Sequence, residues 1–217
     1  MSAVDSDVLV FLVDDDVGVT DGLSWLLESV KIPSRAFASP QAFLAAARQH
    51  PGAACAVVDL RMPEMSGLEL QQRLSEAGCD MPLIFLTAHG DVSAAVHAMQ
   101  AGAVDFVQKP FNPERFLASV RKSMRLSSTR FAQRQQSLSL QRRLASLSPR
   151  EAEVLQAMLV GQTSKEIARG LGISPKTVDV HRANIVRKMG AESSTQIVRE
   201  LAGSLMTALP HQAPTDC

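Results

Sequence analysis

Five side chains that could bind or accept a phosphoryl group follow short apolar runs in the first half of the 217-residue sequence. They are the carboxylates of Asp14, Asp15 and Asp59, the hydroxyl of Thr87 and the ammonium of Lys109. Ligands of doubly wound sheets bind beyond the carboxyl ends of the strands. If the apolar runs are neighbouring parallel strands, these five side chains converge on one edge of a sheet.

The chemistry that this set favours is phosphoryl transfer to a carboxylate. Carboxylates this close together raise one another's pKa unless a cation joins them. Mg²⁺ suits such a site because it takes one or two carboxylates, keeps several waters and meets phosphate oxygens. An aspartate can itself accept a phosphoryl group as nucleophile, with Lys109 offsetting charge and Thr87 donating a hydrogen bond. The alternative is that strand-end acids only cap helices, which suits Asp16.

The apolar runs alternate with segments that carry helix signals. Strands are expected at 8–13, 34–38, 54–60, 82–87 and 103–109. Four of the helices that follow them begin at residues that cap helix N-termini, namely Ser39, Ser66, Asp91 and Asn112. Five strand–helix units in a row predict an α/β doubly wound, flavodoxin-like parallel sheet of five strands.

The two halves of the chain carry opposite charge. The formal net charge is zero, but it is −8 over residues 1–112 and +8 over residues 113–217. From Arg115 to Arg150 there are nine basic residues and no acidic one, without a strand pattern. We expect the fifth helix to continue into this basic segment as a linker. A basic second half indicates a partner that carries phosphates.

The remainder of the second half predicts four short helices. Their start signals are Ser148, Thr163, Ser174 and Ser193, and the first two open capping boxes. A glycine-containing turn at 170–173 separates the second helix from the third, which is typical of a helix-turn-helix. On the third helix a core face is expected from Val178, Ile185 and Met189.

The first half resembles a known family in four motifs: VDDD (13–16), VVDLRMPEMSGLEL (57–70), FLTAHGD (85–91) and AGAVDFVQKPF (101–111). Over about 120 residues they resemble the receiver domain of two-component response regulators, most closely the NarL/FixJ group. The resemblance implies that Asp59 is the phospho-acceptor. It also implies a Mg²⁺ site made by Asp15, Asp59 and the backbone carbonyl of Arg61, with Asp14 assisting. Thr87 and Phe106 would form a switch pair, and Lys109 would contact the phosphate.

Residues 147–191 resemble the LuxR-type helix-turn-helix domain of the same group, with 174–189 as the helix that enters the major groove. By this resemblance four residues face the bases: Lys176, Asp179, Val180 and Ala183. Five others are placed for phosphate contacts: Lys165, Thr177, Arg182, Arg187 and Lys188. Family members often carry Lys where this chain has Asp179, and an acid there could accept a hydrogen bond from cytosine N4.

The predicted organisation is a receiver domain over 1–124, a basic helical linker over 125–145, an all-α, four-helix LuxR-type DNA-binding domain over 146–210 and a tail over 211–217. The predicted function is that of a cytoplasmic transcriptional regulator that catalyses only its own phosphorylation and dephosphorylation. The expected partners are a sensor histidine kinase, double-stranded DNA, a second copy upon phosphorylation and RNA polymerase, with no membrane. No secretory signal is expected at the N-terminus, which carries two acids and no basic residue.

Two other functions fit part of the same sequence. Asp14-Asp15-Asp16 approaches the nucleophile motif of haloacid-dehalogenase-like phosphatases, with Asp14 as nucleophile, although Gly18 departs from that motif. The second alternative is a regulator that is never phosphorylated and dimerises constitutively. A further hypothesis concerns His89, two residues after Thr87, which would lie over the acceptor site and tune hydrolysis of the acyl phosphate. The opposite charges also predict attraction between the two halves.

Overall fold

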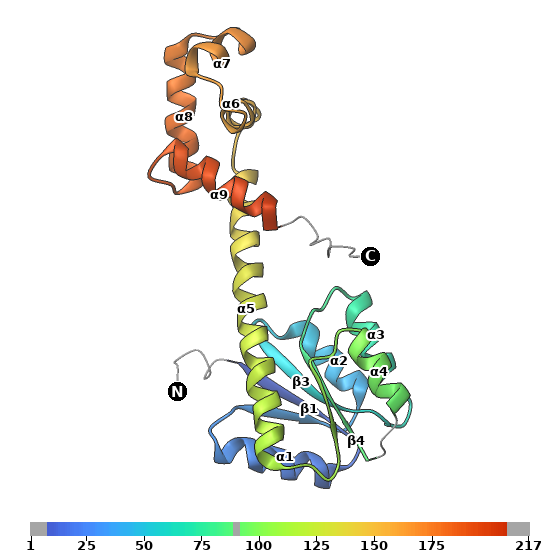
Figure 1. Cartoon of the computed structure of the whole chain (residues 1–217). Helices are drawn as coiled ribbons and strands as arrows, with labels where there is room; N and C mark the ends of the chain where they lie inside the picture. Colours follow the sequence, from blue (N-terminus) through green and yellow to red (C-terminus); the bar gives the residue numbers. More distant parts are fainter. Residues whose placement is uncertain (1–7, 89–91, 208–217) are drawn as a thin grey trace, which may run out of the picture. The chain divides into compact units, whose positions relative to one another are not determined.

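The computed structural model describes residues 8–88 and 92–207 (Figure 1). Its first part contains β1 (Leu9–Val13), α1 (Val17–Ser29), β2 (Ser34–Phe37), α2 (Pro40–Gln49), β3 (Ala54–Asp59), α3 (Gly67–Glu76), β4 (Leu83–Thr87), α4 (Val92–Gln100), β5 (Asp105–Gln108) and α5 (Pro113–Ala145). The five strands are parallel, in the order β2-β1-β3-β4-β5. The predicted doubly wound sheet is therefore confirmed.

The strand bounds agree with prediction to within one residue except at β5, which begins at Asp105 rather than at 103. The reason lies at the end of α4. Gly102 has a positive φ of 91°, and the backbone amide of Ala103 donates to the carbonyl of Ala98. Ala103 thus belongs to the turn that ends α4. Its apolar side chain alone does not distinguish a residue of this turn from a residue of the strand that follows.

Apolar helix faces cover both sides of the sheet (Figure 1). Helices α1 and α5 contribute Leu27 and Phe116 to one core, together with Ile84 of β4. Helices α2, α3 and α4 pack on the opposite face, around Phe43 and Phe85. All six residues of β3 are buried, as expected of a parallel strand covered on both faces. Because helices cover both faces of the sheet, the polar side chains at the strand ends can meet only at the edge formed by the carboxyl ends of the strands.

Helix α5 is continuous for 33 residues. Its Ser127 hydroxyl donates a 2.7 Å hydrogen bond to the carbonyl of Ala54, which fixes the helix against β3. The chain divides into two compact units, Met1–Arg134 and Gln135–Cys217. This division lies within α5, inside the segment 125–145 expected as a linker. In the described part of the chain no helix is long and apolar enough to cross a membrane.

The second unit contains α6 (Pro149–Leu159), α7 (Ser164–Leu171), α8 (Pro175–Met189) and α9 (Ser194–Thr207). Both predicted capping boxes form: the hydroxyls of Ser148 and Thr163 accept from backbone amides, and Glu151 and Glu166 accept in return from the capping residues. Gly172 ends α7 in the left-handed conformation, with φ of 67°, which glycine adopts without steric strain. The expected helix-turn-helix of α7 and α8 is confirmed.

Candidate functional site

The carboxyl ends of β1, β3 and β5 bring three charged side chains together. Lys109 Nζ lies 2.7 Å from Asp14 Oδ2 and 2.8 Å from Asp59 Oδ1. Asp14 is 3% exposed and Asp59 is 8% exposed. One ammonium is thus shared between two nearly buried carboxylates, so the convergence expected from the strand ends is present for these three residues.

Backbone amides hold the second oxygen of each carboxylate. The amide of Arg61 donates to Asp59 Oδ2 over 2.7 Å, and the amide of Asp16 donates to Asp14 Oδ1 over 3.0 Å. Each carboxylate therefore accepts one hydrogen bond from the backbone and one from the ammonium. Two bonds from different directions fix the plane of a carboxylate, and hydrogen bonds to an ionised group are stronger than those between neutral groups.

The two carboxylates also determine the charge of the lysine. Burial lowers the pKa of Lys109, but its hydrogen bonds to Asp14 and Asp59, together with their negative charge, raise the pKa above its ordinary value overall. The side chain is consequently an ammonium at physiological pH. A cation between two adjacent acids offsets the repulsion that would otherwise favour protonation of one of them.

Gly67, the first residue of α3, allows that helix to begin directly against the end of β3. A Cβ at this position would lie 2.5 Å from the backbone oxygen of Asp59 and 2.9 Å from Phe85 Cε1, closer than real Cβ atoms approach. The sequence pattern predicts only the helix cap at Ser66 and does not identify the close packing at Gly67. A glycine immediately after an N-cap, eight residues beyond a strand-end acid, is the signal that could have indicated close packing.

The other two acids after β1, Asp15 and Asp16, are exposed residues between Asp14 and the start of α1. Asp16 is the N-cap of α1, and its carboxylate accepts hydrogen bonds from the amides of Gly18 and Val19. The capping interpretation of Asp16 is therefore confirmed.

The predicted switch residues lie on β4 and β5. Thr87 is buried, and its backbone carbonyl accepts a 2.7 Å hydrogen bond from the amide of Lys109. Phe106 is half-buried and packs against the core formed with α2, α3 and α4. His89 lies outside the described residues, so its proposed position over the acceptor site stays a prediction.

The donor atoms at this edge of the sheet bear on the predicted Mg²⁺ site. Among residues 8–88 and 92–207, no three His, Cys, Asp or Glu side chains are grouped so that they could hold a metal ion. Asp14 and Asp59 do lie together, with the ammonium of Lys109 between them as a cation. Two carboxylates are within the small number of protein ligands that Mg²⁺ takes, since it keeps several waters. The chemistry of these two carboxylates is compatible with Mg²⁺, and the ion itself stays a prediction.

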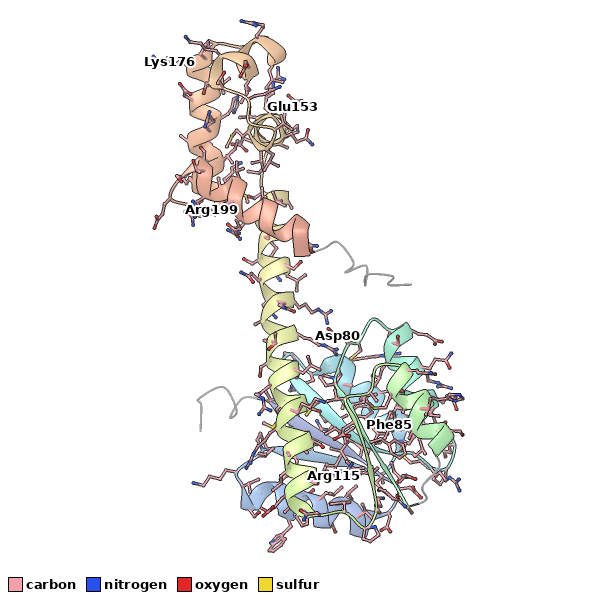
Figure 2. The ribbon with its side chains drawn as sticks, in the orientation of Figure 1. Asp80, Phe85, Arg115, Glu153, Lys176 and Arg199 are labelled. Atoms are coloured by element: carbon pink, nitrogen blue, oxygen red, sulfur yellow. The ribbon has the colours of Figure 1, made fainter. Side chains whose placement is uncertain are left out.

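A second candidate site is the outward face of α8, formed by Lys176, Val180, Ala183 and Arg187, all of them exposed. Thr177 and Asp179 flank this face and are also exposed, as is Lys165 on α7. Val178, Ile185 and Met189 are buried on the opposite side, as predicted. Lys176 projects from the N-terminal end of α8 (Figure 2). A small, basic face of this kind allows close approach to a polyanion.

Two basic residues predicted as phosphate contacts are engaged within the unit. Lys188 is half-buried, and its ammonium donates to Glu151 Oε2 over 2.7 Å and to the carbonyl of Ser146 over 3.0 Å. Arg182 donates to the hydroxyl of Ser164 over 3.1 Å. The contacts of Lys188 give it a structural role that composition alone does not reveal, and its contact with DNA stays a prediction.

The partner of Lys188 is an unusually acidic carboxyl group. Glu151 is 5% exposed. Its hydrogen bond from Lys188 and a second one from the backbone amide of Ser148 lower the pKa of Glu151 to about 2, against the opposing effect of burial. The pair joins the start of α6 to the last turn of α8 and thereby supports the outward face of α8.

Two known protein families match this chain. Residues 10–121 match the family described as "Response regulator receiver domain", and residues 145–201 match the family described as "Bacterial regulatory proteins, luxR family". The first match covers the sheet and the shared lysine, and the second covers the helix-turn-helix.

Characterised relatives align with nearly the whole chain. The transcriptional regulatory protein FixJ of Azorhizobium caulinodans is 42% identical over 207 residues, which are 95% of each chain. The transcriptional regulatory protein TdiR of Thauera aromatica is 42% identical over 87% of this chain and 83% of its own length. Among solved structures, the response regulator StyR is 38% identical, with a TM-score of 0.83, covering 91% of this chain and 99% of that one.

Proposed function

Because this chain belongs to the two-component response regulators of the NarL/FixJ group, it is a transcriptional regulator with a receiver and a LuxR-type DNA-binding domain, and we propose that Asp59 is its phosphoryl acceptor. The observation that carries the proposal is the ion pair at 2.8 Å between Asp59 and Lys109. It places a carboxylate that can act as nucleophile beside a cation that can neutralise a transferred phosphate.

The proposed reaction is transfer of a phosphoryl group from a histidine of a sensor kinase. An oxygen of Asp59 attacks the phosphorus, the bond from phosphorus to the imidazole nitrogen breaks, and the nitrogen keeps the electron pair. The backbone amide of Arg61 holds the second carboxylate oxygen at 2.7 Å, which orients the nucleophile. Lys109 offsets charge on the transferred oxygens, and Thr87 donates a hydrogen bond to the new phosphate.

Four groups would hold the proposed Mg²⁺: the carboxylates of Asp14, Asp15 and Asp59 and the backbone carbonyl of Arg61. When bound, the ion supplies positive charge close to the phosphoryl oxygens. The protein groups orient the acceptor carboxylate and limit its access to water, since Asp59 is only 8% exposed. The proposed activity is restricted to the protein's own phosphorylation and dephosphorylation.

The proposed consequence of phosphorylation is a change in surface around α4, β5 and α5. A phosphate adds a charge of about −1.5 to −2 at neutral pH, which would draw Thr87 and Lys109 toward it and allow Phe106 to turn inward. The altered surface would then bind a second copy, so that paired α8 helices span two half-sites about one helical turn apart.

The proposed DNA contacts are those of the outward face of α8 with the major groove, supported by its exposure and basic charge. Five other residues complete the predicted set: Lys165, Thr177, Asp179, Arg182 and Lys188. We further propose that the DNA-bound dimer recruits RNA polymerase and that the protein acts in the cytoplasm, where the chromosome is. The family relationship favours this function over the phosphatase alternative with Asp14 as nucleophile.

Genome-wide footprinting of wild-type protein and the Asp59→Asn variant tests the proposed function. If wild-type protein occupies promoter sites that the Asp59→Asn variant does not occupy, the result supports phosphorylation-dependent binding. Size-exclusion chromatography with an acyl-phosphate donor and Mg²⁺ provides the matching measurement of dimerisation. Equal occupancy and equal size for both proteins would favour the constitutive regulator instead.

A further inference from the structure

Asp179 places a negative charge at the edge of a face that is otherwise basic or small. It is exposed and lies one turn from Lys176 and from Ala183 on α8. A carboxylate close to a DNA backbone is repelled by phosphates, and it cannot donate a hydrogen bond to them. The acid therefore needs a partner that offers donors, which in DNA means a base edge.

The carboxylate of Asp179 is held from the neighbouring helix. The hydroxyl of Ser164, the first residue of α7, donates to Asp179 Oδ1 over 2.9 Å. Arg182 Nη1 in turn donates to the same Ser164 oxygen over 3.1 Å. The three residues form a chain of hydrogen bonds across the two helices of the helix-turn-helix, which restricts the rotation of the carboxylate.

The second oxygen of Asp179, Oδ2, has no hydrogen-bond partner within the described ranges of the chain, and it is an acceptor only. The major-groove edges of the four bases differ in how they meet an acceptor. Guanine offers only acceptors, thymine offers an acceptor and a methyl group, and adenine places its donor beside the N7 acceptor. Cytosine offers the N4 donor alone, so it satisfies a carboxylate without repulsion.

We propose that Asp179 selects cytosine at one position of each half-site, and that Ser164 and Arg182 are positioning residues that hold its carboxylate for this contact. The inference rests on the proposed binding of α8 in the major groove. It adds a base identity to that binding and assigns to Ser164 a role in specificity.

The test is selection from a randomised double-stranded DNA library by the full-length, phosphorylated protein. Wild-type protein is expected to enrich cytosine about tenfold over the other bases at one half-site position. Asp179→Asn removes the charge and offers a donor and an acceptor, the pattern that pairs with adenine N6 and N7. This variant should change the preferred base at that position from cytosine to adenine and leave the other positions unchanged.

Two further variants separate positioning from folding. Ser164→Ala should weaken the cytosine preference by roughly threefold, because one hydrogen bond to the carboxylate is lost, whereas Ser164→Thr keeps the hydroxyl and should retain the preference. Glu153→Gln is the matched control, because it also removes one exposed negative charge, but on α6 (Figure 2). The control should select the wild-type sequence.

The outcomes distinguish this inference from the function on which it rests. If wild-type protein enriches no sequence from the library, the proposed DNA-binding function fails. If wild-type protein enriches a motif and Asp179→Asn enriches the same motif, DNA binding stands and the inference is overturned. A loss of preference spread evenly over all positions would make Asp179 a structural residue and would also overturn it.

Discussion

Removal of the carboxylate of Glu151 should destabilise the DNA-binding unit in a manner that depends on pH. A pKa of about 2 in the folded state, compared with 4.5 ordinarily, corresponds to on the order of 3 kcal/mol of stability. Because the folded-state pKa is lowered, this stability is present above about pH 4.5 and is lost as the pH falls toward 2. Between pH 5 and pH 3 the loss should be roughly 2 kcal/mol.

The assay is urea unfolding of wild-type protein and Glu151→Gln at pH 5 and pH 3. Circular dichroism follows helices in both units, whereas fluorescence of Trp25, the sole tryptophan, reports only on the receiver unit. At pH 5 circular dichroism should give the variant a lower free energy of unfolding than wild-type protein. Fluorescence should give both proteins the same free energy of unfolding. At pH 3 the difference between the two proteins should have narrowed by roughly 2 kcal/mol. If the difference in free energy of unfolding between the two proteins is the same at both pH values, the pairing with Lys188 does not explain the stabilising role of the Glu151 carboxylate.

Three further substitutions give distinct results. Gly67→Ala should destabilise the receiver unit by about 1–3 kcal/mol, because its Cβ would overlap the Asp59 carbonyl; unfolding followed by Trp25 fluorescence measures this, and wild-type stability would contradict it. Lys176→Ala should weaken binding to selected DNA, measured by fluorescence anisotropy. Arg187→Ala should weaken binding to selected and unrelated DNA alike and reduce the slope of log affinity against log salt by about 1; an unchanged slope would exclude a phosphate contact.

The fold and the centre of the proposed acceptor site were predictable because their signals are local. Strands β1, β3 and β4 are buried apolar runs, and Asp14, Asp59 and Thr87 stand at their carboxyl ends. Parallel pairing then brings Asp14, Asp59 and Lys109 to one edge without further information. The N-cap role of Asp16 was predictable for the same reason, since a cap contacts residues two and three positions away.

The contacts that the sequence left undetermined join residues distant in the chain. Lys188 follows Arg187 on the same basic helix, yet its ammonium pairs with Glu151, 37 residues earlier. Whether a lysine is committed in this way depends on how α6 packs against α8, and charge patterns do not reveal that packing. The link between Ser164 and Asp179 also spans two helices. The closeness of Gly67 to β3 depends in turn on the angle at which α3 leaves the sheet.

The most direct test of the central claim is chemical mapping of the phosphorylated residue. Full-length protein is incubated with a small acyl-phosphate donor and Mg²⁺, the acyl phosphate is reduced with borohydride, and tryptic peptides are analysed by mass spectrometry. Asp59 is the only acidic residue in the tryptic peptide 49–61, whereas Asp14 and Asp15 lie in a different peptide. We predict reduction to homoserine at Asp59 and its loss in Asp59→Asn. Modification at Asp14, or none at Asp59 in folded wild-type protein, would contradict the account.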